Sequence, residues 1–256
     1  MSNPHGTAMV TGPTSGIGRC FADALAGRGH DLVLVARNTE RLEEVAAELR
    51  AHHGVAVEVL RADLVDRAEL ATVEARLADR ARPVQVLVNN AGFGLKGRFL
   101  DNSVELEQAH LDVLVTAVMR LTHAALGTMV AEGNGQIVNV SSVAGFFPRG
   151  SYSAAKAYVT KFSQWAHDEY AAKGVGVMAL CPGFVRTEFH SRMDVDQSSA
   201  PRFMWLDAER LVAEALVDLD AGKAISIPSK RYRAIVRAAH FVPSGALQRL
   251  QKVGRR

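Results

Sequence analysis

The chain has 256 residues, of which 48% are hydrophobic and 22% charged, and its formal net charge is +3. This balance is typical of a globular protein with a sizeable core, and it excludes a disordered chain. Two cysteines are too few for a disulfide framework. The sequence has no uninterrupted run of 18 apolar residues and no pattern of a secretory signal at its start. We therefore expect a cytoplasmic protein without a membrane-spanning helix.

The positive charge is concentrated near the C-terminal end. No acidic residue follows Asp220, whereas nine basic residues do, so the preceding part of the chain is net negative. Nucleic-acid-binding proteins usually spread basic residues over a folded face, and we expect no such partner. Residues 229–256 also carry apolar side chains, which predicts a basic amphipathic extension docked on the body. A membrane-surface contact or a path for an anionic substrate is the alternative.

Short apolar runs alternate with helical patterns along the chain. The predicted strands comprise residues 8–10, 32–36, 55–60, 84–88, 135–140, 175–180 and 224–227. The predicted helices comprise residues 16–28, 39–52, 66–80, 103–131, 151–173 and 206–219. Continuous apolar strands are buried on both faces of a sheet, and the alternation with helices predicts parallel connections. We expect an α/β fold with a doubly wound parallel sheet of about seven strands.

A glycine-rich turn leads from the first predicted strand into a helix. It contains Gly12, Thr14, Ser15, Gly16, Ile17 and Gly18. Glycines let the backbone approach a pyrophosphate, and a helix N-terminus offers free N–H groups to it. A glycine-rich turn without a ligand is the alternative.

The second strand ends at Arg37, where many dinucleotide sites have a carboxylate for the adenine ribose. An arginine there can pair with a 2′-phosphate, so we expect NADP(H) as the cofactor. A solvated Arg37 at the start of a helix is the alternative.

Polar residues follow three further strands. These are Asp63-Leu64, Asn89-Asn90-Ala91-Gly92 and Ser141-Ser142. The carboxyl ends of parallel strands are where open α/β sheets bind ligands. We therefore expect these residues to gather at one edge of the sheet.

Tyr152 and Lys156 lie four residues apart in a predicted helix and therefore on one face of it. A nearby ammonium favours the phenolate, so we expect Lys156 to lower the pKa of Tyr152 and make it an acid or base near neutral pH. An isolated pair at this spacing also occurs on protein surfaces.

Taken in order, these segments resemble the short-chain dehydrogenase/reductase family over about residues 7–228. The runs 32–49 and 181–187 are similar to an NADP-dependent ketoreductase branch that includes bacterial DltE-type oxidoreductases and 3-oxoacyl reductases. The resemblance implies a three-layer, Rossmann-like single domain that transfers hydride between a nicotinamide and a carbonyl or alcohol. Residues 1–228 would form the dinucleotide-binding and catalytic part, and 229–256 its extension.

The resemblance also implies roles for individual residues. Tyr152 is the acid/base, Lys156 holds the nicotinamide ribose, and Ser142 polarises the substrate carbonyl. Ser142 is preferred over Ser141 because Ser-Val-Ala-Gly follows the family pattern. The cofactor contacts would come from Gly12, Thr14, Ser15, Gly16, Ile17, Gly18, Arg37, Asp63, Leu64, Asn90, Ala91, Gly92, Tyr152, Lys156, Pro182, Gly183, Val185 and Thr187, with Asn90 at the nicotinamide ribose. No metal is expected.

Two departures from the family pattern concern the substrate side of the site. Leu114 stands where the family has an asparagine that helps a water connect the lysine to solvent, and leucine has no donor or acceptor. The loop 143–150 is three residues shorter than is common in the family. A cofactor-binding protein with weak or lost turnover is therefore one alternative to an enzyme, and a peripheral membrane reductase of lipid ketones is another.

Three further expectations concern the substrate, the partner and the histidines. The loop 184–205 should cover an apolar carbonyl or alcohol substrate, with Phe189, Met193, Phe203, Met204 and Trp205 as an apolar lid; a loop that packs its own core is the alternative. The resemblance implies a homodimer or homotetramer that pairs through helices 103–131 and 151–173. His110, His123 and His167 lack metal-ligand spacing, and we interpret them as structural or surface residues.

Overall fold

The computed structural model describes residues 5–186 and 201–239. Seven parallel strands form one sheet in the order β3-β2-β1-β4-β5-β6-β7. Their bounds are β1 Thr7–Thr11, β2 Asp31–Ala36, β3 Val57–Arg61, β4 Val84–Asn89, β5 Gly135–Val140, β6 Val175–Leu180 and β7 Ile225–Ser226. This order confirms the doubly wound parallel sheet of the predicted fold.

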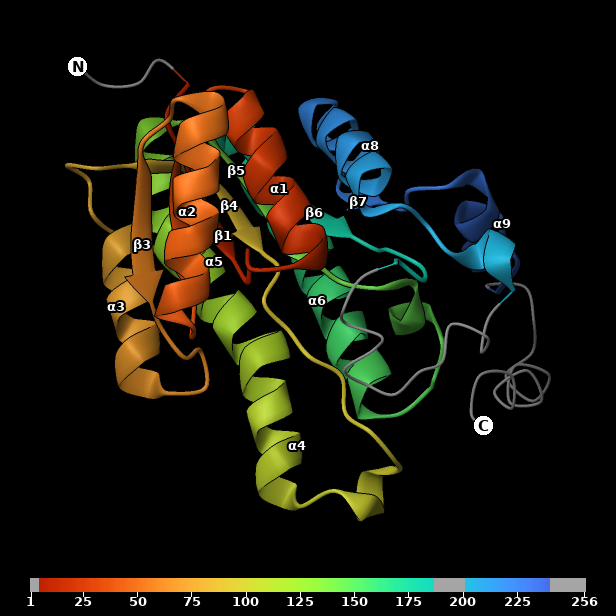
Figure 1. The fold of residues 1–256 in the computed structure, drawn as a ribbon. Helices are drawn as coiled ribbons and strands as arrows, with labels where there is room; N and C mark the ends of the chain where they lie inside the picture. The colour runs from red at the N-terminus through yellow and green to blue at the C-terminus, as the bar shows by residue number, and fades with distance from the viewer. Residues whose placement is uncertain (1–4, 187–200, 240–256) are drawn as a thin grey trace.

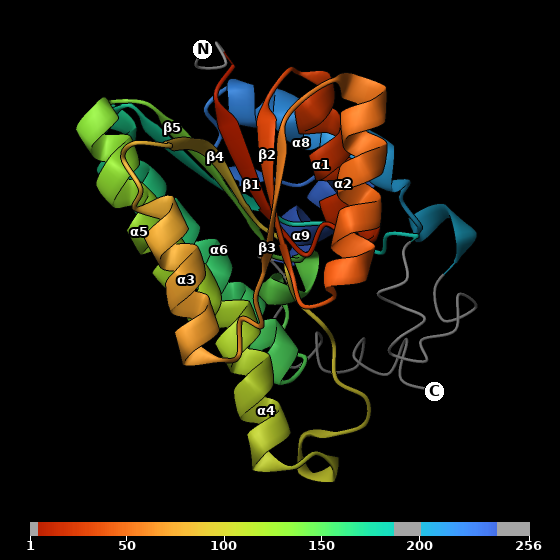
Figure 2. The same ribbon diagram turned by 60° about the vertical axis from the view of Figure 1, so that its left-hand side comes forward.

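Helices cover both faces of the sheet and make the fold three-layered (Figures 1 and 2). One layer has α1 Gly16–Gly27, α2 Thr39–His53 and α8 Ala208–Asp220, and the other has α3 Arg67–Leu77, α5 Val118–Glu132 and α6 Ser151–Tyr170. The helix α4 Val104–Leu111 precedes α5, and α9 Lys230–Ala239 follows β7. The single Rossmann-like domain is thereby confirmed, and α9 adds a helix to those predicted.

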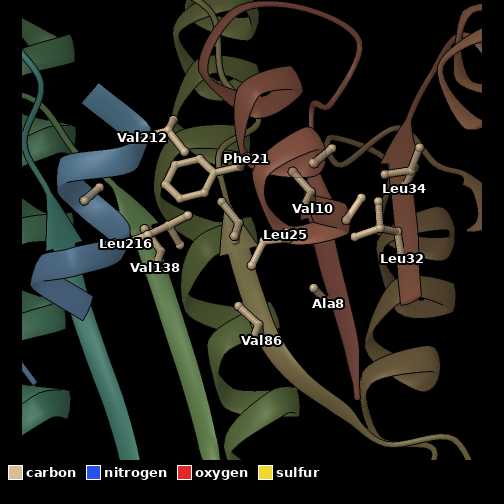
Figure 3. Close-up of a cluster of buried hydrophobic side chains, with 14 of the residues drawn as sticks. Ala8, Val10, Phe21, Leu25, Leu32, Leu34, Val86, Val138, Val212 and Leu216 are labelled. Atoms are coloured by element: carbon tan, nitrogen blue, oxygen red, sulfur yellow. The ribbon is translucent and has the colours of Figure 1, made fainter. Parts of the chain in front are cut away.

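A buried cluster fills each space between the sheet and a helical layer. In the first cluster, Phe21 and Leu25 of α1 pack beside Val212 and Leu216 of α8 over the central strands (Figure 3). The second cluster lies between the opposite sheet face and α3, α5 and α6. Burial on both faces explains why the strands are continuously apolar.

Local chemistry fixes several helix ends. The side chain of Asn38 accepts a hydrogen bond from the Arg41 N–H at the start of α2, and Gly54 ends that helix with a φ of +69°. The side chain of Asp66 accepts from two N–H groups at the start of α3. Such caps satisfy backbone groups that a helix end leaves unpaired.

The long helix predicted over residues 103–131 contains a change of helical type. A π-helical segment, η2 Asp112–Ala117, joins α4 to α5. The whole stretch Val104–Glu132 is long and apolar enough to cross a membrane by length and composition. More than half of its most apolar window is buried inside the fold, as in a core helix of a soluble domain.

The strand order reverses direction beside β1, which lies between β2 and β4. The chain leaves the carboxyl end of β1 toward α1 and leaves that of β4 toward the opposite layer, and this switch point is where open α/β sheets bind ligands. The glycine-rich turn and the Asn90–Gly92 segment lie at this point.

Candidate active site

The turn after β1 is shaped for a close approach to a ligand. Gly12 and Gly16 have φ angles of +67° and +55°, in the left-handed region that favours glycine. A Cβ at Gly18 would lie 2.2 Å from the Gly12 carbonyl oxygen, so that position also requires glycine. The Ser15 side chain makes no cap hydrogen bond at the start of α1. The first turn of α1 therefore presents N–H groups without a side-chain cap, which fits a pyrophosphate.

Asn90 holds the glycine turn in place. Its Nδ2 donates to the carbonyl oxygens of Thr11 and Gly12, at 3.0 Å each. The backbone N–H groups of Asn90 and Ala91 donate to Thr11 Oγ1, also at 3.0 Å. The Asn90 side-chain amide thus donates to the backbone of the turn. The expected contact of Asn90 with the nicotinamide ribose stays a prediction.

Arg37 lies at the carboxyl end of β2 with its side chain 70% exposed. Its Nη1 is 3.9 Å from Asp63 Oδ2, a long ion pair, and Asp63 Oδ1 accepts the Val65 N–H at 3.1 Å. An exposed pair at this distance contributes little, so the guanidinium is available to an incoming phosphate.

The structure distinguishes the two serines that follow β5. Ser141 is buried, and its Oγ donates to the Lys156 carbonyl oxygen at 2.7 Å. Ser142, in contrast, forms a side-chain hydrogen bond with Tyr152 and accepts the Ala144 N–H at 3.1 Å. The serine that the family pattern selects is therefore the one beside the tyrosine.

The short loop after Ser142 packs tightly on α6. Its 3₁₀ turn, η3 Val143–Phe146, places Gly145 so close that a Cβ there would lie 2.8 Å from the Ala157 nitrogen. Gly150, with a φ of +99°, then starts α6. The shortened loop thereby brings Ser142 to Tyr152 without the extra residues common in the family.

Burial decides the protonation of the acid/base pair. It raises the pKa of Tyr152 to about 12, although the hydrogen bond with Ser142 acts in the opposite direction. Lys156 donates from Nζ to the Val140 carbonyl oxygen at 2.7 Å, and Nζ lies 5.8 Å from the centre of the Tyr152 ring. Our expectation that Lys156 lowers the pKa of Tyr152 is therefore wrong for this structure. The phenol is protonated at neutral pH and suits a proton donor.

Burial also lowers the pKa of Lys156, to about 8. The ammonium form therefore dominates at neutral pH but is less strongly favoured than on a surface. Its bond to the Val140 carbonyl fixes the side chain beneath the tyrosine.

Comparisons with known proteins agree with this geometry. Residues 6–198 match the family model described as short chain dehydrogenase. A short-chain dehydrogenase from Sphingobium yanoikuyae, solved in complex with NADPH, is 40% identical with a TM-score of 0.85, covering 96% of this chain and 94% of the other. The chain belongs to the short-chain dehydrogenase/reductase family. Its members are oxidoreductases that act on CH–OH and C=O groups.

Two further relatives differ in how much of their length this chain covers. The bulky-bulky ketone specific alcohol dehydrogenase from Comamonas testosteroni is 34% identical with a TM-score of 0.80, and 92% of each chain is covered. The very-long-chain 3-oxoacyl-CoA reductase of Anas platyrhynchos is 34% identical over 189 residues, which are 71% of this chain and 60% of that protein. The chain therefore spans less than two thirds of the duck reductase.

In this short-chain dehydrogenase, the Pro182-Gly183 segment is covered by α9. The Tyr232 ring lies so close to Gly183 that a Cβ there would be 2.0 Å from it. Tyr232 Oη accepts the Phe184 N–H at 3.0 Å and donates to the Met204 carbonyl oxygen at 2.8 Å. The start of the basic extension thus contacts the body through Tyr232, and residues 240–256 lie outside the described part.

The expected lid residues behave differently from one another. Trp205 is buried, and its ring packs against Phe184 with the centroids 5.4 Å apart, as the alternative of a loop with its own core predicts. Phe203 is 62% exposed and lies beside the Arg231 guanidinium. Val185 is buried and pairs with Leu206. Phe189, Met193 and the cofactor residue Thr187 lie outside the described residues.

Leu114 and His110 line the inner face of the α4–η2 stretch. Leu114 is 1% exposed and packs so closely over Gly92 that a Cβ there would lie 2.8 Å from Leu114 Cδ2. His110 is fully buried and stacks on Tyr152, with ring centroids 6.0 Å apart and an interplanar angle of 26°. The helical pattern indicates an inward position for His110, but sequence reasoning missed that Tyr152 faces it, because this contact joins residues 42 positions apart.

Proposed function

We propose that this chain is an NADP(H)-dependent carbonyl reductase with Tyr152 as its acid/base. The observation that carries the proposal is the half-buried, protonated Tyr152, hydrogen-bonded with Ser142 beside Lys156. The glycine turn follows the carboxyl end of β1, and Ser142 follows the carboxyl end of β5 in the same parallel sheet. This common sheet edge supports a single site for cofactor and substrate.

Tyr152, Ser142 and Lys156 have different roles in the proposed reduction. Bound reduced nicotinamide supplies the hydride that adds to the carbonyl carbon. Tyr152 donates its proton to the carbonyl oxygen, where negative charge develops. Ser142 orients that oxygen by a hydrogen bond and so stabilises the same charge. Lys156 holds the ribose and keeps a positive charge beside the tyrosine when it becomes a phenolate.

The preference for NADP(H) over NAD(H) rests on Arg37. Its exposed guanidinium lies at the end of β2, where a 2′-phosphate would need a cation. The Sphingobium relative is described in complex with NADPH. The N–H groups of residues 16–18 would hold the pyrophosphate, and Arg37 the additional phosphate.

The substrate we propose is a bulky, apolar ketone or the corresponding alcohol. Exposed Phe203 beside the loop stem offers an apolar surface. The Comamonas relative is a bulky-bulky ketone specific alcohol dehydrogenase, and the duck relative is a very-long-chain 3-oxoacyl-CoA reductase. We propose a cytoplasmic location, with the docked α9 favouring this over a membrane anchor.

A cofactor-binding protein without turnover is the second candidate, and Leu114 is the observation that favours it. One experiment separates the two. The purified protein is titrated with NADPH and NADH by fluorescence, and NADPH oxidation is followed with ketosteroids, 3-oxoacyl thioesters, aldehydes and small ketones. The reductase predicts tighter NADPH binding and oxidation with at least one bulky ketone. Binding without oxidation across the whole panel would favour the non-catalytic alternative.

A further inference from the structure

Two buried acceptor atoms lie unpaired on α4 next to the acid/base tyrosine. His110 is fully buried and Glu107 is 6% exposed. Within the described residues, His110 Nδ1 and Glu107 Oε2 have no hydrogen-bond partner. Buried polar atoms are rarely left unpaired, because their desolvation is then uncompensated. The pair therefore indicates a ligand with donor groups.

The hydrogen bonds that are present define the chemistry of both side chains. His110 Nε2 lies 3.1 Å from the Phe93 carbonyl oxygen, which can only accept, so the ring proton is on Nε2 and Nδ1 is an acceptor. Glu107 Oε1 accepts from Asn102 Nδ2 at 3.0 Å, and the Ser151 side chain also acts on the carboxylate. Burial acts to raise the pKa of Glu107, but Ser151, Asn102 and His110 together outweigh it and the pKa lies below its usual value. Nδ1 and Oε2 are thus both acceptors.

The two residues are three positions apart and therefore neighbours on one helix face. Each side chain acts electrostatically on the other. One water has two O–H groups, which is the number that two neighbouring acceptors require. Burial lowers the pKa of His110, Glu107 opposes this effect, and Lys156 adds to it, so a neutral imidazole is the resting form.

We propose that Glu107 and His110 bind a buried water that returns the proton to Tyr152 after each reduction, a role that Leu114 cannot support. This inference rests on the proposed function. The water donates one O–H to Glu107 Oε2 and the other to His110 Nδ1. When Tyr152 has become a phenolate, the second O–H turns to it and transfers its proton while the water takes up a proton from solvent, so that no hydroxide is left beside the carboxylate. Glu107 and His110 keep their charges throughout, and His110 acts as a positioning residue.

A matched pair of substitutions tests this role. His110→Gln places an amide near the position of Nε2 and keeps a donor for Phe93, but it removes the acceptor. His110→Asn keeps an acceptor near Nδ1 and loses the bond to Phe93. We expect kcat to fall at least ten-fold in the glutamine variant, with NADPH affinity within two-fold of wild type and a larger solvent deuterium isotope effect on kcat. Added imidazole should restore part of this loss, and the asparagine variant should keep the higher kcat of the two.

A merely structural role predicts a different result. Losing the Phe93 bond would then make His110→Asn the less stable and less active variant, and a glutamine variant with wild-type kcat would overturn the proposal. His167, whose Nδ1 contacts the Val177 carbonyl away from the site, supplies the matched control as His167→Asn, which should keep wild-type kcat.

The wild-type protein provides a test that does not depend on turnover or on folding of the variants. ¹⁵N NMR of the histidines should show His110 protonated on Nε2 only at pH 8. A crystal structure should contain an ordered water within about 3 Å of both Nδ1 and Oε2. A proton on Nδ1, or a dry site, would overturn the proposal even if the enzyme is active. A wild type that reduces no carbonyl would instead contradict the proposed function. The tautomer of His110 and the presence of the water would still test the proposed water site.

Discussion

Arg37 is the side chain on which the cofactor preference depends. We expect Arg37→Asp to weaken NADPH binding by about ten-fold or more, because a charge-assisted contact is replaced by repulsion between carboxylate and phosphate. The new carboxylate can accept from the adenine ribose hydroxyls, so NADH binding should improve. Equilibrium titration of both proteins with both cofactors measures the change. Equal affinity of the wild type for NADPH and NADH would contradict the role of Arg37.

Leu114 allows a second test at the residue scale. If the water at His110 and Glu107 supplies the proton, Leu114→Asn should change kcat by less than about three-fold. The same substitution should destabilise the fold, because it buries an amide where a leucine packs over Gly92. Steady-state kinetics and urea unfolding measure both effects. A large gain in kcat at unchanged stability would show that the wild type lacks a proton path.

At the scale of elements, α9 connects the two ends of the loop 184–205 that is expected to cover the substrate. Tyr232 joins the two stems of that loop through hydrogen bonds to Phe184 and Met204. Tyr232→Phe keeps the ring against Gly183 but leaves both backbone groups unpaired, at a cost of about 1–3 kcal/mol in the free energy of unfolding. We expect KM for the ketone to rise more than the dissociation constant of NADPH.

At the scale of the whole molecule, one helical layer exposes an aromatic ridge. Trp165 is 53% and Tyr158 40% exposed on α6. The Phe162 ring stacks on Tyr158 with centroids 5.8 Å apart and is tilted against Trp165 with centroids 5.9 Å apart. Met119 on the neighbouring α5 is 39% exposed. An exposed apolar surface of this kind is typical of an interface. It lies on the two helices through which the family resemblance implies pairing.

We therefore expect a light-scattering mass of at least twice the 27.6 kDa of one chain. Trp165→Asp should shift the mass toward the monomer, because it places a charge in the centre of the ridge. The circular dichroism spectrum should not change, since Trp165 contributes to no buried cluster of the described fold. A wild-type monomer at micromolar concentration would contradict the predicted pairing.

The sequence predicts the sheet and most of the site because both depend on local patterns. Apolar runs identify the strands, and Tyr152 and Lys156 keep the four-residue spacing of the family. Ser142 is identified by the Ser-Val-Ala-Gly run, although the loop between it and Tyr152 is shorter than usual. The π segment at 112–117 was not predictable, since its residues keep the apolar periodicity of an α-helix. The raised pKa of Tyr152 depends on burial by distant segments, and so does the contact with His110. Local spacing of Tyr152 and Lys156 therefore gave the wrong direction for that pKa.

The central claim is tested most directly by the rate of ketone-dependent NADPH oxidation in the wild type and in Tyr152→Phe. The substitution removes the proton donor and keeps the ring that stacks on His110. We predict a kcat lower by roughly two to four orders of magnitude. NADPH affinity, measured by fluorescence titration, should stay within two-fold of the wild type. Near wild-type turnover in Tyr152→Phe would contradict the account.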